Sequence, residues 1–319
     1  MPDDLYPIEL EAPDIAPYRA GNTGIDYVTT LDSGRDGPHV MLSALVHGNE
    51  ICGAIALDFL FREAVRPRIG KLTLAFANVA AYQSFDPQDP GASRFVDEDF
   101  NRLWSPAVLE GTRDSAELRR ARELRPVVDE VDFLLDIHSM QHATPPLMMA
   151  GPLPKGRALA LEVGVPEIVI GDAGHAAGTR LRDYDGFARA ASPKNALLVE
   201  CGQHWERNSA AVAIETALRF LLRSGTVDPD VAARHLNAEP RRGQRFIEVT
   251  SPVTIETDDF RFAGEFHGLE VIARAGTVIG TDGDRPIATP YDDCVLIMPS
   301  RRLRRGESAV RFGRFVAPP

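Results

Sequence analysis

Apolar residues along the first 225 positions follow two different spacings. Some segments are short continuous apolar runs, typical of buried strands, and others repeat an apolar residue every three or four positions, typical of helices. The apolar runs predict strands at 39–46, 71–79, 131–137, 146–151, 167–172 and 195–202. The helical spacing predicts helices at 51–65, 115–130 and 208–223. The first 35 residues predict at most one edge strand, and residues 80–106, rich in proline, glycine and aspartate, predict a long loop.

Strands that alternate with helices indicate an α/β fold with a mixed, mostly parallel sheet flanked by helices. The pattern changes near residue 230, where the chain turns polar and loses its strong periodicity. From about residue 243 onward, short β-like runs are separated by glycine and proline. We therefore predict a larger α/β domain at 1–230 and a smaller, all-β C-terminal domain at 231–319.

Composition and charge restrict the class of protein. The net charge is −11, which argues against a nucleic-acid partner because such binding needs a cationic surface. No apolar stretch is long enough for a transmembrane helix, and the acidic N-terminus lacks the features of a secretory signal, so no membrane partner is expected. The three cysteines are odd in number and far apart, which favours a reducing, cytoplasmic location. The sequence leaves open a homo-oligomer.

Polar residues that can carry chemistry follow the predicted strands. His47 and Glu50 lie in the turn after strand 39–46, and His138 follows strand 131–137. Ligands of open α/β sheets bind beyond the carboxyl ends of the strands, so these groups are expected to meet. Two imidazoles and a carboxylate suit a catalytic zinc ion. Taken singly, each has an ordinary alternative as a helix-capping glutamate or a structural histidine.

Two further carboxylates accompany these groups. Asp136 shares a strand face with His138. It could hold the His138 imidazole in the orientation needed to bind a metal ion. The alternative is a hydrogen-bonded carboxylate at the end of the strand. Glu200 lies in an apolar strand, where a carboxylate is costly unless it has a partner or a function. Near zinc, Glu200 would serve as a general base; the alternative is a paired glutamate at the edge of the core.

The predicted loop carries candidate groups for binding an anion. An arginine fork binds both oxygens of a carboxylate, and Asn101 beside Arg102 adds an amide donor. Arg94 lies eight residues before Arg102. The alternative for this segment is a surface loop with salt bridges to neighbouring acidic residues, namely Asp97, Glu98 and Asp99.

Taken together, the strings ALVHGNEICG, DEDFNRLW, LLDIHS and LLVECG resemble the aspartoacylase / succinylglutamate desuccinylase family, which has a zinc-carboxypeptidase-like fold. The resemblance covers about residues 39–225, and residues 264–296 resemble the family's small barrel-sandwich-like β domain. It implies that 1–230 is a zinc-hydrolase catalytic domain. It further implies that one Zn²⁺ per chain is held by His47, Glu50 and His138, and that Glu200 is the general base.

The resemblance also assigns the loop residues. Arg94 matches the arginine that polarises the scissile carbonyl, and Asn101 with Arg102 matches the pair that holds the α-carboxylate of the substrate. Some members of the family have a further arginine, about ten residues before the base, that binds a carboxylate on the side chain of the substrate. Position 190 is alanine here, so the residue that fills this role stays open. The candidates are Arg180, Arg182 and Arg189.

We therefore expect a zinc-dependent amidohydrolase that deacylates an N-acyl amino acid or related small amide through a metal-bound water. Its partner would be a small N-acyl substrate that carries a carboxylate. The alternatives are a metallocarboxypeptidase acting on peptides and a non-catalytic metal-binding protein. A wide groove would favour the carboxypeptidase, whereas a C-terminal domain that roofs the pocket would favour a small substrate.

Some remaining polar residues are expected to have other roles. We predict that three histidines are not metal ligands, namely His142, His175 and His204. Tyr291 is either a turn aromatic or a residue that reaches the site. The arginines at 301–305 are predicted to form a solvated face.

Overall fold

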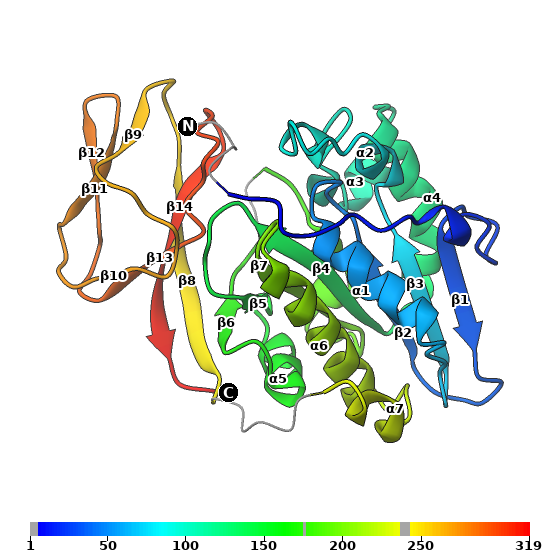
Figure 1. Ribbon diagram of the computed structural model, residues 1–319. Helices are drawn as coiled ribbons and strands as arrows, with labels where there is room; N and C mark the ends of the chain where they lie inside the picture. Colours follow the sequence, from blue (N-terminus) through cyan, green and yellow to red (C-terminus); the bar gives the residue numbers. More distant parts are fainter. Residues whose placement is uncertain (1–5, 175–176, 237–242) are drawn as a thin grey trace.

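The computed structural model describes residues 6–174, 177–236 and 243–319. Its main feature is an 11-stranded mixed sheet in the order β1-β3-β2-β4-β7-β5-β6-β8-β14-β13-β10, with a separate three-stranded sheet in the order β12-β11-β9 (Figure 1). The strands of the large sheet are β1 (Val28–Asp32), β2 (His39–Ala44), β3 (Lys71–Phe76), β4 (Phe133–Met140), β5 (Leu147–Met149), β6 (Ile168–Gly171), β7 (Asn195–Gln203), β8 (Arg245–Thr254), β10 (Val271–Ile272), β13 (Cys294–Ile297) and β14 (Ser308–Val316). The small sheet contains β9 (Phe260–Phe262), β11 (Val278–Asp282) and β12 (Arg285–Ala288).

Helices cover both faces of the central strands. The helices are α1 (Ile51–Arg62), α2 (Val79–Gln83), α3 (Pro106–Leu109), α4 (Ala116–Glu130), α5 (Pro154–Val163), α6 (Arg207–Arg223) and α7 (Pro229–Ala233). In Figure 1, α1 and α6 lie in front of the sheet and α4 lies behind it. Successive strand residues point to opposite faces, so Leu135 belongs to the core under α1 and α6, whereas Leu134 packs in the cluster that contains α4.

The centre of the sheet is parallel, as the sequence predicts. Strands β3, β2, β4 and β7 are neighbours that run in the same direction, and every residue of β2 and β7 is buried. Strands that are covered on both faces require continuous apolar runs, and this explains why the sequence pattern identified them. The predicted edge strand is β1, which pairs antiparallel with β3.

The boundaries of several elements differ from the predictions. Strand β4 continues to Met140, three residues beyond its predicted end, so His138 lies inside the strand. The predicted loop at 80–106 contains part of α2 and two short 3-10 turns, η3 (Ala92–Arg94) and η4 (Phe100–Arg102). Helix α5 was not predicted, although Pro154 at its first turn and a buried apolar face are helix signals.

The C-terminal β segments extend the large sheet before they form a layer of their own. Strand β8 pairs in parallel with β6, and β14, β13 and β10 follow in antiparallel order. A separate apolar cluster, which includes Phe260, Ile279 and Leu296, lies in this C-terminal part. The expected fold class, a mixed α/β sheet with a smaller all-β part, is confirmed. In the part of the chain that the structure describes, no helix has the length and apolar character needed to cross a bilayer.

Candidate metal centre and substrate cavity

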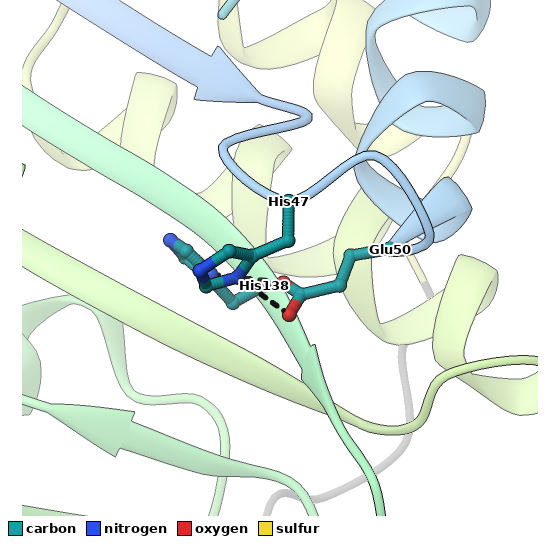
Figure 2. Close-up of side chains that lie close together, drawn as sticks. All are labelled: His47, Glu50 and His138. Carbon is teal, nitrogen blue, oxygen red and sulfur yellow. Dashed lines mark hydrogen bonds and ion pairs between the residues drawn. The ribbon is translucent and has the colours of Figure 1, made fainter. Parts of the chain in front are cut away.

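Three predicted metal ligands meet in a buried cluster. His47 and Glu50 come from the turn after β2, and His138 comes from β4 (Figure 2). One ligand atom from each residue can be chosen so that all three lie within 4.8 Å of one another. The Nδ1 atom of His47 is 2.7 Å from Glu50 Oε1, and the Nδ1 atom of His138 is 2.8 Å from Glu50 Oε2. Both imidazoles therefore direct the same ring nitrogen toward one carboxylate.

The turn between β2 and α1 fixes the first two groups. Leu45 adopts a positive φ of 60°, an uncommon backbone conformation for a bulky residue. Gly48 donates its backbone N–H to the carbonyl of Arg94 at 3.1 Å, and a Cβ at this position would lie 2.4 Å from the Ser93 carbonyl oxygen. Glycine is thus needed where the turn contacts the η3 segment, which couples the position of His47 and Glu50 to that of Arg94.

A second carboxylate supports each histidine from behind. Asp99 Oδ1 lies 2.9 Å from His47 Nε2, and Asp136 Oδ2 lies 2.9 Å from His138 Nε2. Metal-binding histidines commonly bond a carboxylate through the nitrogen that does not face the metal. With Glu50, three carboxylates surround the two imidazoles, and Arg94 and Arg102 lie within 4 Å of these carboxylates. The donor set and its supports therefore fit a divalent cation such as zinc.

The charges of the cluster depend on one another. Burial alone would raise the pKa of Glu50, but the imidazoles of His47 and His138 outweigh this effect and hold that pKa well below its usual range. Burial alone would lower the pKa of His138, but Asp136 and Glu50 raise that pKa well above its usual value. Glu50 is thus kept as a carboxylate, the form that binds metal ions.

Glu200 lies beside the cluster and differs from Glu50 in its surroundings. In the parallel pairing of β4 and β7, Glu200 is the register partner of His138. Glu200 is 7% exposed, and its Oε2 atom is buried without a hydrogen-bond partner among the described residues. Burial, followed by the charge of Glu50, raises the pKa of Glu200 well above its usual value. A buried carboxyl group with an unused oxygen is available to exchange a proton with a ligand.

The η3–η4 segment brings Arg94 to the metal ligands. The Arg94 guanidinium donates to Glu50 Oε1 at 3.3 Å and to Asp99 Oδ2 at 3.2 Å. Burial alone would raise the pKa of Asp99, but His47 and Arg94 hold it well below its usual range. The alternative interpretation of this segment is a surface loop whose acidic residues form salt bridges. Asp99 instead bonds both a predicted ligand and a predicted catalytic arginine.

Glu117 of α4 holds this segment in place. Its buried carboxylate accepts backbone N–H groups of residues 96–98 at 2.6–3.2 Å, and it also accepts the side-chain amide of Asn78 at 3.0 Å. Helix α4 itself begins after Ser115, whose hydroxyl caps the N–H of Leu118. Backbone groups of an irregular segment are thus satisfied by one side chain, which gives the segment a defined conformation.

Asn101 and Arg102 lie at the other end of the segment. The side-chain oxygen of Asn101 accepts the Leu181 N–H at 2.9 Å, so its NH₂ group is the end left for a ligand. Arg102 donates to the Asn101 carbonyl oxygen at 2.7 Å and lies 3.7 Å from Asp99 Oδ2. Both residues line the same cavity as the metal cluster.

The cavity has a volume of about 330 Å³ and is built from both parts of the chain. All seven predicted site residues line it: His47, Glu50, Arg94, Asn101, Arg102, His138 and Glu200. The C-terminal part also contributes lining residues, among them Met298, Arg302, Arg304, Glu307 and Arg311. The C-terminal β segments therefore form part of the wall of the cavity.

Of the three histidines that we predict not to bind metal, two line the cavity, and neither belongs to the metal cluster. His142 lines it, and burial, followed by the charge of Arg301, lowers the pKa of His142 to about 4. His204 Nδ1 lies 2.9 Å from the Ser139 hydroxyl, and burial lowers the pKa of His204 to about 3. Among the described residues, the group able to hold a metal ion contains neither of them. His175 lies outside the described residues.

The arginines considered for a side-chain carboxylate already have partners. Arg180 binds Asp172 through two hydrogen bonds of 2.7 and 3.0 Å, and it also binds Asp183. Arg182 donates to Asp183 and to the carbonyl oxygens of residues 150 and 196. Arg189 is exposed and pairs with Asp185. None of the three presents an unbonded guanidinium to the cavity.

Two expectations about the C-terminal part have different outcomes. Tyr291 is a turn aromatic that bonds the Thr250 hydroxyl at 2.6 Å and does not line the cavity. The expectation of a solvated arginine face at 301–305 is wrong for Arg302, which lines the cavity and donates to the Gly91 carbonyl oxygen at 2.9 Å. The loop packs back onto the α/β part, so its charge pattern alone did not reveal this contact.

Sequence reasoning also missed several residues of the site. Asp99 was treated only as a surface charge, although its position two residues before Asn101 was a signal that it could reach the same site. Ser139, whose N–H donates to Glu50 Oε2 at 3.2 Å, had no distinctive pattern. Arg311 of β14 follows Glu200 by more than 100 positions, and no local feature of the sequence places it near the cavity.

The fold and the buried cluster define an α/β protein with a candidate metal centre at the carboxyl ends of its central strands. The family model described as "Succinylglutamate desuccinylase/Aspartoacylase catalytic domain" matches residues 36–220, which is more than half of the chain. The chain belongs to this family, whose named members are deacylases. The family assignment predicted from the sequence is thereby confirmed.

Solved structures of similar fold cover nearly the whole chain. Succinylglutamate desuccinylase from Vibrio parahaemolyticus is 17% identical with a TM-score of 0.64, covering 92% of this chain and 87% of that one. Succinylglutamate desuccinylase/aspartoacylase from Rhodobacter sphaeroides is 20% identical with a TM-score of 0.63, covering 91% and 89%. The ectoine utilization protein EutE from Ruegeria pomeroyi is 16% identical with a TM-score of 0.61, covering 92% of each chain. A search of curated protein sequences finds no significant match. At these identities, the likeness to solved structures concerns the fold.

Proposed function

We propose that this protein is a zinc-dependent amidohydrolase that removes the acyl group from an N-acyl amino acid or a related small amide. One observation carries the proposal: a buried His–Glu–His cluster lies beside Glu200, a carboxyl group with an unbonded oxygen, in a cavity of small-molecule size. The cluster would hold the metal through His47, Glu50 and His138. When bound, zinc supplies Lewis acidity, which polarises a carbonyl group and favours formation of hydroxide near neutral pH.

Glu200 would act as the general base and then as the general acid. Its raised pKa gives it a higher proton affinity than an exposed glutamate, so it can accept a proton from water and return it to the leaving nitrogen. The unbonded Oε2 atom is free to contact that water. Since Glu50 is held as a carboxylate in the same cluster, the two glutamates would divide the tasks of metal binding and proton transfer.

Arg94 would bind the carbonyl oxygen as negative charge develops on it. Its guanidinium is held against Asp99 and Glu50, so little reorganisation is needed when the substrate arrives. Arg102 and the amide of Asn101 would hold the α-carboxylate, which orients the substrate before the reaction.

The size of the cavity favours a small substrate over a peptide. A volume of about 330 Å³ lies at the lower end of ligand sites, and side chains of the C-terminal part close one side of it. A carboxypeptidase would require an open groove for the preceding residues of its substrate. None of the proposed ligands or the base is absent, which disfavours a non-catalytic metal-binding protein.

Metal analysis combined with an amine-release screen tests this proposal. Purified protein is analysed for bound metal and assayed for release of primary amine from N-acetyl, N-succinyl and longer N-acyl amino acids, with dipeptides as the comparison. We expect about one zinc per chain and release from acyl amino acids. His47→Ala should lose both metal and activity, whereas His235→Ala, at a histidine paired with Glu63 outside the cavity, should retain them.

Two results would contradict the proposal. Unchanged metal content in the His47→Ala variant would remove this cluster as the metal site. Release of amine from dipeptides but not from acyl amino acids would favour the carboxypeptidase.

A further inference from the structure

The C-terminal part places an arginine inside the catalytic cavity. Arg311 lies on β14, the red strand of Figure 1, opposite Ile297 of β13 and Pro252 of β8. Its side chain lines the same cavity as His138 and Glu200. Arg311 is thus brought to the site by the sheet that β8 and β14 form, and not by the η3–η4 segment that carries Arg94 and Arg102.

Arg311 differs in its partners from the arginines that the α/β part contributes to the cavity. Arg94 contacts Glu50 and Asp99, Arg180 is held by Asp172 and Asp183, and Arg102 lies 3.7 Å from Asp99. Arg311 forms no ion pair with any carboxylate in the described ranges 6–174, 177–236 and 243–319. Its one hydrogen-bond contact there is from Nη1 to the thioether sulfur of Met298 at 3.9 Å, and a thioether is a weak acceptor.

Neighbouring charges act on the pKa of Arg311 in opposite directions, and no carboxylate among the described residues forms an ion pair with it. Burial, and then the nearby charge of Arg180, lower the pKa of Arg311, while Asp172 and Glu200 act in the opposite direction. Asp172 already accepts two hydrogen bonds from Arg180. Glu307 also lines the cavity but forms no ion pair with Arg311. The guanidinium of Arg311 has five donors, one weak acceptor and a neighbouring cation, Arg180, and this arrangement favours binding of an anion.

We propose that Arg311 is a specificity-determining residue that binds a second carboxylate of the substrate. This inference rests on the proposed function, in which Arg102 and Asn101 hold the α-carboxylate. The planar fork of Arg311 suits a carboxylate, and Arg102 and Arg311 line the same cavity of about 330 Å³, so one small molecule can contact both. The second carboxylate belongs either to the acyl group or to the side chain of the amino acid.

Three matched substrates test the inference. They also show whether the second carboxylate belongs to the acyl group or to the side chain of the amino acid. N-Butyryl-norvaline has one carboxylate, N-succinyl-norvaline adds one on the acyl group, and N-butyryl-glutamate adds one on the side chain. We expect the wild-type protein to favour one of the doubly anionic substrates. Arg311→Gln should lower kcat/KM for that substrate by about 10- to 100-fold, the range of a lost charge-assisted hydrogen bond, and change N-butyryl-norvaline by less than about 3-fold.

Two further variants separate recognition from a general effect. Arg314→Gln makes the same charge change on the same strand, at an exposed arginine outside the cavity, and should leave the substrate preference unchanged. Arg311→Lys keeps the charge but loses the fork, so it should recover part of the preference. An equal loss for all three substrates in the Arg311→Gln variant, or no loss for any of them, would overturn the proposal. If a thermal melt shows that Arg311→Gln does not fold, the same three substrates are compared between the wild type and the Arg311→Lys variant.

A binding measurement keeps this inference separate from the proposed activity. Calorimetric titration of the metal-loaded protein with glutarate and with butyrate compares a dianion with a monoanion, without turnover. The wild-type protein should bind glutarate more tightly, and Arg311→Gln should abolish that difference. The proposed function fails only if the amine-release screen finds no acyl amino acid that the metal-loaded protein cleaves, whereas the glutarate result decides the role of Arg311 even if none of the three substrates is cleaved. Equal affinity of the wild type for both acids would refute that role.

Discussion

The arginines of the cavity differ according to the part of the chain that supplies them. Those of the α/β part, such as Arg94 and Arg180, are bonded to carboxylates of the same part, and these bonds fix their orientation before any ligand binds. Arg311 of the C-terminal part has no such partner among the described residues. Intramolecular pairing suits a group that stabilises a transition state, because it needs little reorganisation. An unpaired arginine is suited to selecting a ligand, because the ligand supplies the missing charge.

The C-terminal part also contains an arginine that is paired with a carboxylate. Elsewhere in that part, Arg285 bonds Asp282 at 3.3 Å, and Asp282 also accepts backbone and hydroxyl hydrogen bonds from Glu256 and Thr257. The small sheet therefore pairs its buried charges in the usual way. Arg311 of β14 differs from Arg285 of the same part, because no carboxylate among the described residues forms an ion pair with it.

The largest expected effect concerns Glu200, the proposed base, which lines the same cavity as these arginines. Glu200→Gln keeps the shape of the side chain but removes its ability to accept a proton, so we expect kcat to fall by about 10²- to 10⁴-fold with full metal content. Steady-state kinetics and metal analysis check this result. Glu265→Gln, at an exposed glutamate outside the cavity, is the matched control. A Glu200→Gln variant with most of its activity would remove Glu200 as the base.

A somewhat smaller effect is expected at the paired arginine. Arg94→Met removes a donor held ready for the developing oxyanion, so kcat should fall by about 10²- to 10³-fold. Because Arg94 contacts Asp99 and Glu50 in the resting state, metal affinity is measured in the same variant. An effect on KM alone, with kcat unchanged, would mean that Arg94 binds the substrate and the transition state equally well. Arg94 would then not be a group that stabilises the transition state.

A change at Arg102, which we propose to bind the α-carboxylate, should affect KM rather than kcat. Arg102→Gln is expected to raise KM by about 10- to 100-fold with a small change in kcat, since the α-carboxylate contact is the same in the ground and transition states. Substrate-saturation curves provide the measurement. A fall in kcat without a change in KM would show that Arg102 acts on the reacting carbonyl, contrary to its proposed role.

The smallest effect concerns stability at acid pH and tests pairing within the C-terminal part. Hydrogen bonds from Thr257 and from backbone N–H groups lower the pKa of Asp282 from 3.8 to about 2. Since the folded pKa is below the ordinary value, this contribution to stability is present above about pH 4 and is lost as the pH falls toward 2. Asp282→Asn should therefore lower the thermal midpoint near neutral pH and have less effect at pH 2. An equal effect at both pH values would show that ionisation is not involved.

Much of the site was predictable because its residues are marked by local patterns. His47 and Glu50 follow a continuous apolar strand, and Glu200 interrupts another one with a charge. Parallel strands bring their carboxyl ends together, so the order of elements was enough to expect that these groups meet. The end of β4 was misplaced because polar residues at its end pair with β7 in the interior, where the register His138–Glu200 overrides the local polarity.

The sequence by itself determined the α/β class, the metal-ligand candidates and the family, because strand and helix periodicity and the ligand motifs are properties of neighbouring residues. Only the tertiary structure decided which charges are paired. Asp99 supports His47 across 52 positions, and Arg311 reaches the cavity through the pairing of β14 with β8 and β13. Such pairings depend on distances between segments remote in the chain, and long-range packing sets those distances.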